Sequence, residues 1–437
     1  MRDIVIIAIV LGASLVALRR PWIGVLLWTW LSLMSPHRYA YGFAYSAPVA
    51  AIAALTTLLG LLMTRDRRSP FESSPPVWLA LLTVWITLSW AFGLDPSGDY
   101  AMWDKVMKIN IMVLVSIALL FTRQHILAFA WVVAGSLALV GMKGGLFTVL
   151  SGGGYRVYGP PDSFVEENNS FGLALVMTIP LLRFLQMQVR VGWQRHALTV
   201  AMLLCAASAL GSHSRGALLA ISCMTLLLWW RGKNRIKNGL ILALVAVSLV
   251  AFMPAQWSER MATIDNYQQD ESAQGRLDAW RNAVGVAMDY PLGAGFQPNR
   301  QEFFNLYSGG SQARAAHSIY FQILGNHGFV GLFLYLGLFF STFLLAGRLR
   351  KQAQALPEAQ WCEQLAGMCQ VSLVGYFVGG AFLSLAYYDL AYNVMVLVVV
   401  AYAWFKRRAW ATEPVYPRRW WSVPGLPTAV SPTKGKK

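Results

Sequence analysis

Arginine side chains interrupt an otherwise apolar sequence at points where a charge is costly. Arg215 is the clearest case, because it lies in GSHSRGALLA between two apolar runs with almost no loop around it. A charge near membrane depth usually marks a function or a partner, and the planar guanidinium group binds phosphate through two parallel hydrogen bonds. We therefore predict that Arg215 binds a phosphate or pyrophosphate; the alternative is that it reaches the lipid head groups or pairs with an acid such as Asp389. Further arginines outside the expected cytoplasmic loops are Arg156, Arg276, Arg281, Arg300 and Arg314.

Histidine supplies the second candidate group. His317 opens an apolar run after a long polar segment, and Arg314 lies one turn earlier if the helix extends that far back. A neutral imidazole can accept the proton of a hydroxyl group near pH 7, and a neighbouring arginine would keep it neutral by lowering its pKa. His317 is the predicted base, with a helix-capping role as the alternative and His213, beside Arg215, as the rival. His327 lies about 15 Å further along by helical rise, where a buried hydrogen-bonding role is expected.

Acidic residues are few in the segments that carry these groups. No pair of them has the spacing of a metal site such as D-x-D, so we predict no metal ligand and no cofactor. The glycine-rich stretch at 151–154 lacks the lysine and the strand-to-helix context of a nucleotide loop. The arginines, rather than a metal ion, are therefore expected to stabilise the charge of a leaving group.

The composition places these groups in a membrane protein. The chain of 437 residues is 56% hydrophobic and 13% charged, with a mean hydropathy of +0.47, whereas soluble domains carry about 25% charged residues. Its apolar runs have the length of helices that cross a bilayer, and backbone polar groups in lipid must be paired internally. We predict an all-α integral membrane protein, a polytopic helical bundle. The formal net charge of +16 then reflects Lys- and Arg-rich cytoplasmic loops rather than a nucleic-acid partner.

The expected spans alternate with basic clusters, which we place on the cytoplasmic side. This gives about twelve spans, with the short first segment as a partial or tilted helix. The four cysteines lie in or beside these segments and are expected to be free core residues. The expected apolar segments are 4–18, 21–36, 47–63, 75–94, 104–121, 125–149, 170–187, 197–211, 216–230, 238–254, 318–346, 365–385 and 390–405.

This orientation predicts two long loops on the periplasmic side, at 150–169 and 255–317. The second has a helix-like stretch from Arg276 to Met288 followed by a glycine turn, so we expect a small folded cap rather than a linker. Both loops belong to one polytopic domain, residues 1–408. The proline-rich, polar segment 409–437 is expected to be a flexible cytoplasmic tail.

Three stretches resemble the motifs of a known family. HSIYFQILGNHGFVG at 317–331 has the pattern His, then Asn, Ser or Gln, nine residues, Gly, two residues, then Gly, Thr or Tyr; here these are His317, Ser318, Gly328 and Gly331. The sequence SRGALLA at 214–220 and the sequence GRLDAWRNAVGVAMDYPLGAGF at 275–296 are similar to two further motifs. Together they resemble the O-antigen ligases, whose superfamily also holds O-antigen polymerases and protein O-oligosaccharyltransferases. The resemblance covers roughly residues 125–405.

The resemblance implies an enzyme of the bacterial inner membrane with its active site facing the periplasm. Such ligases transfer a glycan from undecaprenyl pyrophosphate to lipid A–core, with inversion and without metal or cofactor, in a GT-C-like bundle of about twelve spans. No obligate protein partner is implied, and membrane lipids surround the enzyme. If the roles of the family motifs apply to the matching residues, Arg215 and Arg276 would hold the pyrophosphate. His317 would act as the base for the acceptor hydroxyl or would position it, and Ser318 would contact the acceptor. From their location alone, we add Arg156, His213 and Arg314 to the predicted substrate-binding residues.

Other functions remain open at this point. An O-antigen or exopolysaccharide polymerase shares the donor and differs in the acceptor, and a protein O-oligosaccharyltransferase is a third member of the superfamily. The sequence RRPWIGVLLWTWLSLMSPHR at 19–38 is similar to ligases that accompany exopolysaccharide export. A transporter of lipid-linked sugars is an alternative from another class, because Lys105, Lys108 and Lys143 lie in or near apolar segments.

Overall fold

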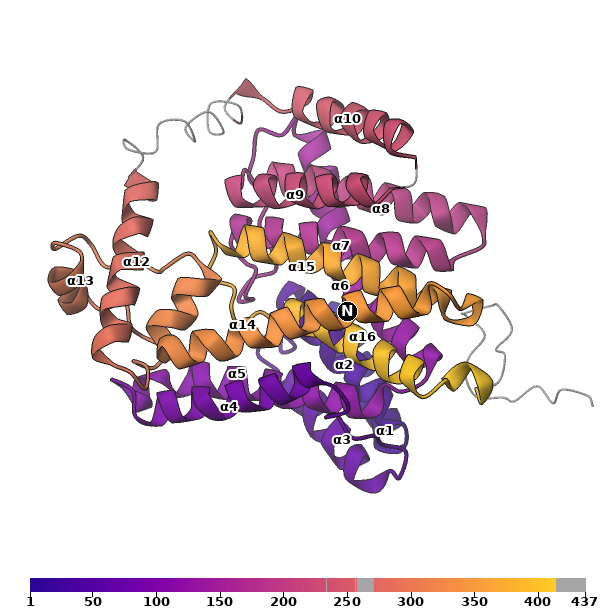
Figure 1. The fold of residues 1–437 in the computed structure, drawn as a ribbon, viewed down its shortest axis with the longest axis horizontal. Helices are drawn as coiled ribbons and strands as arrows, with labels where there is room; N and C mark the ends of the chain where they lie inside the picture. Colours follow the sequence, from indigo (N-terminus) through magenta and orange to yellow (C-terminus); the bar gives the residue numbers. More distant parts are fainter. Residues whose placement is uncertain (233, 256, 258–270, 414–437) are drawn as a thin grey trace, which may run out of the picture.

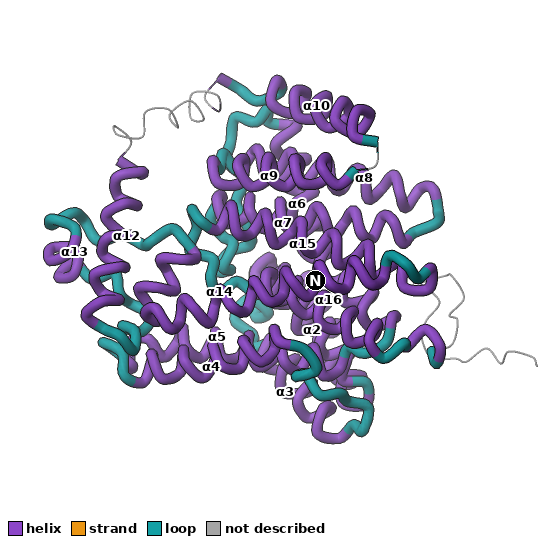
Figure 2. The backbone as a smooth tube through the Cα atoms, viewed as in Figure 1, coloured by secondary structure: helices purple, strands orange, loops and turns teal. Residues whose placement is uncertain are grey.

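The computed structural model describes residues 1–232, 234–255, 257 and 271–413, and every regular element in these residues is a helix (Figures 1 and 2). The main helices are α1 (Arg2–Arg19), α2 (Pro21–Met34), α3 (Val49–Met63), α4 (Ser74–Ala91), α5 (Pro96–Leu119), α6 (Arg123–Leu150), α7 (Asn168–Gln188), α8 (Gly192–Gly211), α9 (Arg215–Arg231), α10 (Arg235–Ala251), α12 (Glu271–Asp289), α13 (Gln301–Tyr307), α14 (Ile319–Ala353), α15 (Gln360–Gly380) and α16 (Asp389–Lys406). Short 3-10 turns occur at Pro36–Tyr39 (η1), Pro357–Ala359 (η2) and Ala409–Ala411 (η3).

The lengths and compositions of the helices confirm an all-α membrane protein. Five described helices, α4, α6, α7, α14 and α16, are long and apolar enough to cross a bilayer, and shorter apolar helices lie at Pro21–Met34, Val49–Met63 and Gly239–Ser248. The number of about twelve spans and their orientation remain predictions. The predicted span 104–121 lies in a helix that begins earlier, at Pro96, because Asp95 caps it by accepting a hydrogen bond from the Gly98 N–H at 2.9 Å.

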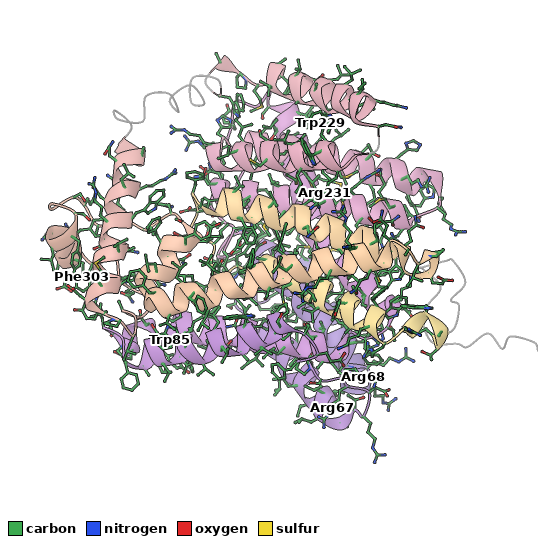
Figure 3. All side chains as sticks on the ribbon, in the orientation of Figure 1. Arg67, Arg68, Trp85, Trp229, Arg231 and Phe303 are labelled. Carbon is green, nitrogen blue, oxygen red and sulfur yellow. The ribbon has the colours of Figure 1, made fainter. Side chains whose placement is uncertain are left out.

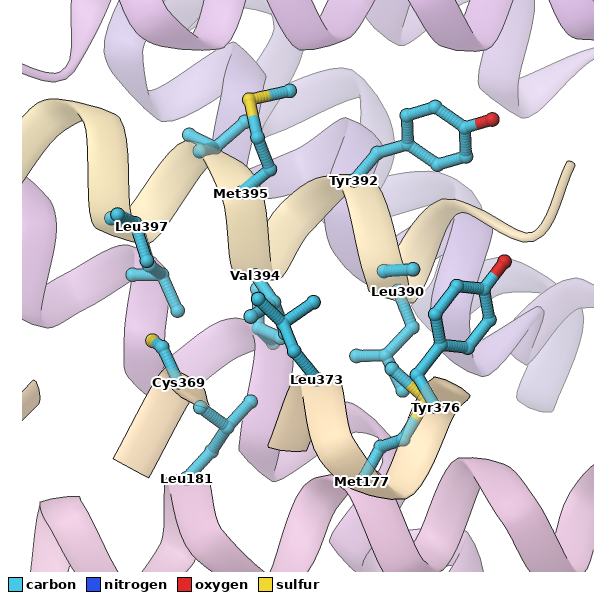
Figure 4. Packing of buried hydrophobic residues seen from close by; sticks show 14 of the residues in the cluster. Met177, Leu181, Cys369, Leu373, Tyr376, Leu390, Tyr392, Val394, Met395 and Leu397 are labelled. Atoms are coloured by element: carbon cyan, nitrogen blue, oxygen red, sulfur yellow. The ribbon is translucent and has the colours of Figure 1, made fainter. Parts of the chain in front are cut away.

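The core of the bundle lies where α15 packs between α7 and α16. Figure 4 shows Cys369, Leu373 and Tyr376 of α15 beside Met177 and Leu181 of α7 and beside residues of α16. All of these α15 side chains are fully buried. Of the four cysteines, all of which are free, Cys205, Cys362 and Cys369 are buried and Cys223 is partly buried, which confirms their expected core role.

Helix α14 is broken at Gly328, where the sequence predicted one continuous span over 318–346. Gly328 has φ 67° and ψ −172°, a conformation essentially restricted to glycine. The carbonyls freed by the break find partners outside the helix: Asn326 accepts from Ser89 Oγ and from the Gly295 N–H, both at 3.0 Å, and His327 accepts from Trp85 Nε1 at 2.8 Å. The half-helix from Ile319 to the break is therefore held against α4 and the segment after α12.

Helices α12 and α13 lie together at one end of the bundle, at the left in Figure 1. Helix α12 confirms the helix expected over residues 276–288, and α13, which the sequence analysis did not foresee, follows it. Figure 3 labels Phe303 on α13 at this end and Trp85 on the neighbouring α4. The glycine turn between the two helices has positive φ at Gly293 (97°) and Gly295 (88°), and a side chain on Gly293 would meet Ser89 Oγ at 2.2 Å. The turn can therefore pack directly on α4.

The predicted flexible tail begins with a packed turn. Trp410 lies against Trp404 and Phe405 with ring centroids 5.6 and 5.5 Å apart. Glu413 accepts hydrogen bonds from Trp404 Nε1 at 2.9 Å and from the Arg123 N–H at 3.2 Å. Residues 409–413 thus belong to the helical body, and residues 414–437 lie outside the described part of the chain.

Candidate functional site

Three helices begin near the glycine pair that ends α15. A side chain on Gly379 would meet Leu173 of α7 at 2.5 Å and Ala220 of α9 at 3.1 Å, and a side chain on Gly380 would meet Ile319 of α14 at 2.7 Å. Small residues allow helices to approach closely in a membrane. The N-terminal parts of α7, α9 and α14 therefore converge on the same end of α15.

This convergence favours an anion. The first turn of each helix presents backbone N–H groups without intrahelical partners, and the helix dipole adds partial positive charge there. Arg215 is the first residue of α9, directly after Ser214, whose Oγ caps the helix by accepting from the Ala217 N–H at 3.2 Å. Gly216 lies 3.6 Å, measured from an added Cβ, from the Gly379 carbonyl. The structure thus places Arg215 at the meeting point of the three helix starts.

His317 lies at the start of α14 in a backbone conformation that few residues adopt. Its φ is 43°, and Ser318 follows as the N-cap of the helix. Histidine enters this left-handed region more readily than most residues. Helix α12 fixes the surrounding chain, because Trp280 Nε1 donates to the Ala316 carbonyl at 2.8 Å and its ring stacks on Phe321 at 4.7 Å and 9°. Helix α12 therefore contacts the chain on both sides of His317, at Ala316 and at Phe321.

The charges around His317 favour its neutral form. The pKa of the partly buried imidazole is lowered from its usual 6.5, first by burial and then by the positive charges of Arg276 and Arg314, while Glu167 opposes the shift. The expected effect of Arg314 on His317 is confirmed. The geometry differs from the expected helical turn, however, because α14 begins only at Ile319 and Arg314 reaches the site from an extended segment.

Gly275 of α12 makes room for this arginine. A side chain on Gly275 would lie 2.6 Å from Arg314 Nη1 and 3.0 Å from its Cδ. The guanidinium group therefore runs across the face of α12 one residue before Arg276. In this way two arginines from distant parts of the sequence reach the surroundings of one histidine.

Ser318 carries an unused polar group at this position. The residue is 1% exposed, and its Oγ has no hydrogen-bond partner among the described residues. A buried hydroxyl without a partner is costly. Ser214 Oγ, in contrast, caps α9, and a contact between Ser318 Oγ and a substrate remains a prediction.

His213 occupies the corresponding place before α9 and has a structural contact. It is buried, its φ is 55°, and its Nε2 lies 3.0 Å from the Gly153 carbonyl. Gly153 lies in the loop between α6 and α7. A later residue of the same loop is attached to the end of α8, because the Val157 N–H donates to the Gly211 carbonyl at 3.0 Å. Arg156 lies between these attachments with an exposed side chain. Both residues therefore lie where residues 153–157 pack on the segment between α8 and α9, and their proposed contacts with substrate remain predictions.

His327 confirms the buried hydrogen-bonding role expected of it. It is fully buried, with Nδ1 2.9 Å from Ser89 Oγ and Nε2 2.7 Å from the Tyr387 hydroxyl. Both ring nitrogens are thus occupied by groups of the protein. This leaves the ring without a free position for acid–base chemistry.

Two of the arginines noted in the sequence bind acids elsewhere. Arg281 pairs with Asp278 at 3.2 Å on the exposed side of α12. Arg300 lies 3.9 Å from Asp95 and 3.8 Å from Glu302. All three pairs have the character of surface ion pairs, which contribute little to binding or stability.

Sequence reasoning missed the parallel between the two histidines. The dipeptide His-Ser occurs at 213–214 and again at 317–318, each time directly before a helix. This repeat was visible in the sequence as a signal for two similar helix starts. Glu167 is one of the few acidic residues in these segments, and no local pattern indicated that it would act on the charge of His317.

Comparison with known families agrees with this geometry. Residues 200–336 match the model of the O-antigen ligase family, a region that contains Arg215, Arg276, Arg314, His317 and Ser318. Residues 1–190 match a family of unknown function (DUF5935). No curated protein matches the chain. The match over residues 200–336 supports membership of this chain in the O-antigen ligase superfamily.

Proposed function

We propose that this protein is an O-antigen ligase that transfers a glycan from undecaprenyl pyrophosphate to lipid A–core at the periplasmic face of the bacterial inner membrane. The observation that carries the proposal is the setting of His317. Its ring is kept neutral by burial and by Arg276 and Arg314, close to the helix starts where Arg215 lies. A neutral base beside several cations suits a reaction that removes a proton and releases an anion.

The proposed reaction is a single displacement that inverts the anomeric centre. An acceptor hydroxyl oxygen forms a bond to the anomeric carbon, while the bond from that carbon to the pyrophosphate oxygen breaks and its electron pair leaves with the pyrophosphate. His317 takes the hydroxyl proton. General base catalysis of this kind contributes about 10²–10⁴-fold.

The leaving pyrophosphate needs the larger stabilisation, which we assign to Arg215 and Arg276. Guanidinium groups and helix N-termini aimed at the developing charge act without reorganisation at the moment of reaction. Their contacts are strengthened where low dielectric replaces water, as at a membrane surface. Arg314 and Arg156 add positive charge to the path of the donor, and His213 holds the loop beside Arg215.

The position of the site suits two amphiphilic substrates. Prenyl and acyl chains remain in the bilayer while the sugars meet outside it, so the pyrophosphate stays at the interface. To Ser318, whose buried Oγ has no hydrogen-bond partner among the described residues, we assign a contact with the acceptor hydroxyl beside His317. This arrangement explains why ionisable residues occur at the start of a strongly apolar helix.

Lipopolysaccharide profiling of a deletion strain tests the proposal. Uncapped core together with accumulated long polymer on undecaprenyl pyrophosphate supports a ligase, and complementation should require Arg215 and His317. Core that carries a single repeat unit would instead indicate a polymerase. Unchanged lipopolysaccharide together with loss of a glycan from proteins would indicate a protein O-oligosaccharyltransferase.

A further inference from the structure

A second group of cations lies in the N-terminal helices and has no part in the proposed mechanism. It consists of Arg38 in η1, Lys105 in α5 and Lys143 in α6, which we call the N-terminal cationic cluster. Arg38 pairs with Asp162 at 3.3 Å, two residues before Phe164, whose ring contacts Lys105. Lys143 is connected to the same turn, because its Nζ lies 5.4 Å from the ring centroid of Tyr39.

Both lysines of the cluster rest on aromatic rings rather than on acids. Lys105 Nζ lies 3.7 Å from the ring centroid of Phe164, a cation–π contact like that of Lys143 with Tyr39. Among the described residues, neither ammonium group has a carboxylate within 4.0 Å. Both side chains are exposed. The aromatic contacts thus orient both ammonium groups, and no ion pair in the described part of the chain neutralises them; the ammonium group of Lys105 is partly buried against Phe164.

The acids near the cluster are already engaged. Asp162 accepts a hydrogen bond from the Tyr45 hydroxyl at 2.6 Å and pairs with Arg38 at 3.3 Å. Asp389, which also acts on the charge of Lys105, is 3% exposed and accepts a hydrogen bond from Ser32. Neither carboxylate forms an ion pair with a lysine of the cluster. The positive charges of Lys105 and Lys143 are therefore not compensated by an ion pair with either acid.

One loop connects the cluster to the candidate active site. Phe164 of this loop carries Lys105 on its ring, and three residues later Glu167 acts on the charge of His317. Phe164 of this loop therefore contacts the cluster, and Glu167 of the same loop acts on the proposed catalytic histidine. A substrate that occupies both places would lie along residues 162–167.

We propose that the N-terminal cationic cluster binds a phosphate group of the glycolipid acceptor. The inference rests on the proposed function for its choice of acceptor. In an inverting displacement the hydroxyl attacks from the side opposite the leaving group, so the acceptor approaches away from the arginines that hold the pyrophosphate. The cluster supplies cations on a different set of helices, and lipid A carries phosphate groups that such cations bind.

Direct binding measurements test the cluster independently of transfer. The full-length protein is placed in nanodiscs of neutral phosphatidylcholine, and its affinity for bisphosphorylated lipid A is compared with that for chemically dephosphorylated lipid A. We expect the wild type to prefer the phosphorylated form. The double variant Lys105→Ala, Lys143→Ala should weaken that binding about tenfold, since each charged contact near a surface is worth up to about fivefold.

Two matched variants make the measurement specific. Lys108→Ala removes a lysine from the same helix, one that is paired with Asp104 at 2.5 Å, and it should leave lipid A affinity unchanged. The double variant Lys105→Arg, Lys143→Arg keeps both charges and should retain the preference for phosphorylated lipid A. In a transfer assay, the double alanine variant should raise the KM for the acceptor while kcat and the affinity for undecaprenyl pyrophosphate stay constant.

The outcomes separate this inference from the proposed function. Equal affinity of the wild type and the double alanine variant for phosphorylated lipid A would overturn the inference while leaving the ligase proposal intact. Displacement of lipid A by equimolar phosphatidylglycerol would also overturn it, because the cluster would then be a general phospholipid site. A wild type that prefers phosphorylated lipid A through these lysines but transfers no glycan would instead overturn the ligase proposal alone.

Discussion

His213 and His317 share one backbone conformation and differ in what their rings contact. Their φ angles are 55° and 43°, and each precedes a serine at the N-cap position of a helix. The His213 ring lies 3.0 Å from the Gly153 carbonyl and fixes a loop. Among the described residues the His317 ring has no hydrogen-bond partner, and it faces the charges of Arg276 and Arg314. The same local structure thus carries a loop contact at α9, and at α14 it carries the histidine that we propose as the base.

Replacing each histidine with asparagine should separate these two roles. Asparagine also enters the left-handed region, so the helix starts are preserved. His317→Asn should lower the transfer rate by about 100-fold or more through loss of the base, with an unchanged melting temperature in detergent. His213→Asn should lower stability by about 1 kcal/mol through loss of a buried hydrogen bond. A fully active His317→Asn protein would remove this residue from the mechanism.

The pH dependence of transfer should show a base that titrates below 6.5. Because burial, Arg276 and Arg314 lower the pKa of His317, its neutral form persists to lower pH, and activity should be lost only as the pH falls through the shifted pKa. Removing the opposing charge with Glu167→Gln should move the acidic limb to lower pH. Arg314→Gln should move it to higher pH.

Transfer rates measured over a pH range that extends well below and well above the midpoint would establish these acidic limbs. A midpoint that is the same in the wild type and in both variants would show that His317 is not the titrating group. Movement of both variants in the same direction would contradict the charge arrangement around its ring.

The two capping serines provide a further matched comparison. Ser214→Ala removes an N-cap hydrogen bond and should cost about 1 kcal/mol of stability. Ser318→Ala removes an Oγ that has no partner among the described residues, so stability should be unchanged or slightly higher. The KM for the acceptor should rise only for Ser318→Ala. An unchanged KM there would argue against its contact with the acceptor.

Metal removal tests the mechanism from another direction. Because arginines and helix starts are assigned to the leaving pyrophosphate, transfer should continue at its full rate after treatment with EDTA. Assays with purified protein, before and after dialysis against EDTA and then with added Mg²⁺, would check this. Loss of activity that Mg²⁺ restores would contradict the assignment.

The candidate site residues could be predicted from the sequence because they are charged groups in an apolar chain or belong to motifs. Contacts between residues far apart in the sequence could not be predicted. Arg215 and His317 stood out because ionisable side chains next to apolar runs require a reason. The position of Glu167 beside His317 depends on how α7, α9 and α14 meet at Gly379 and Gly380, which no local pattern encodes. The hydrophobic pattern likewise predicted a continuous span through Gly328, because a glycine is tolerated within a helix. The break depends on packing against α4 and the glycine turn after α12, which the pattern does not show.

The break at Gly328 should be essential to the placement of His317. Alanine at this position would adopt φ 67° and ψ −172° only with strain, and its Cβ would lie 2.9 Å from the Pro291 carbonyl oxygen. We expect Gly328→Ala to lower stability by about 1–3 kcal/mol and to reduce transfer, because the half-helix that begins beside His317 ends there. Gly12→Ala in α1 is the control, since nothing lies within 4 Å of its added Cβ and alanine favours a helix by about 1 kcal/mol. Thermal melting and transfer rates of both variants would check this, and a Gly328→Ala protein as stable and active as Gly12→Ala would show that the half-helix does not depend on the break.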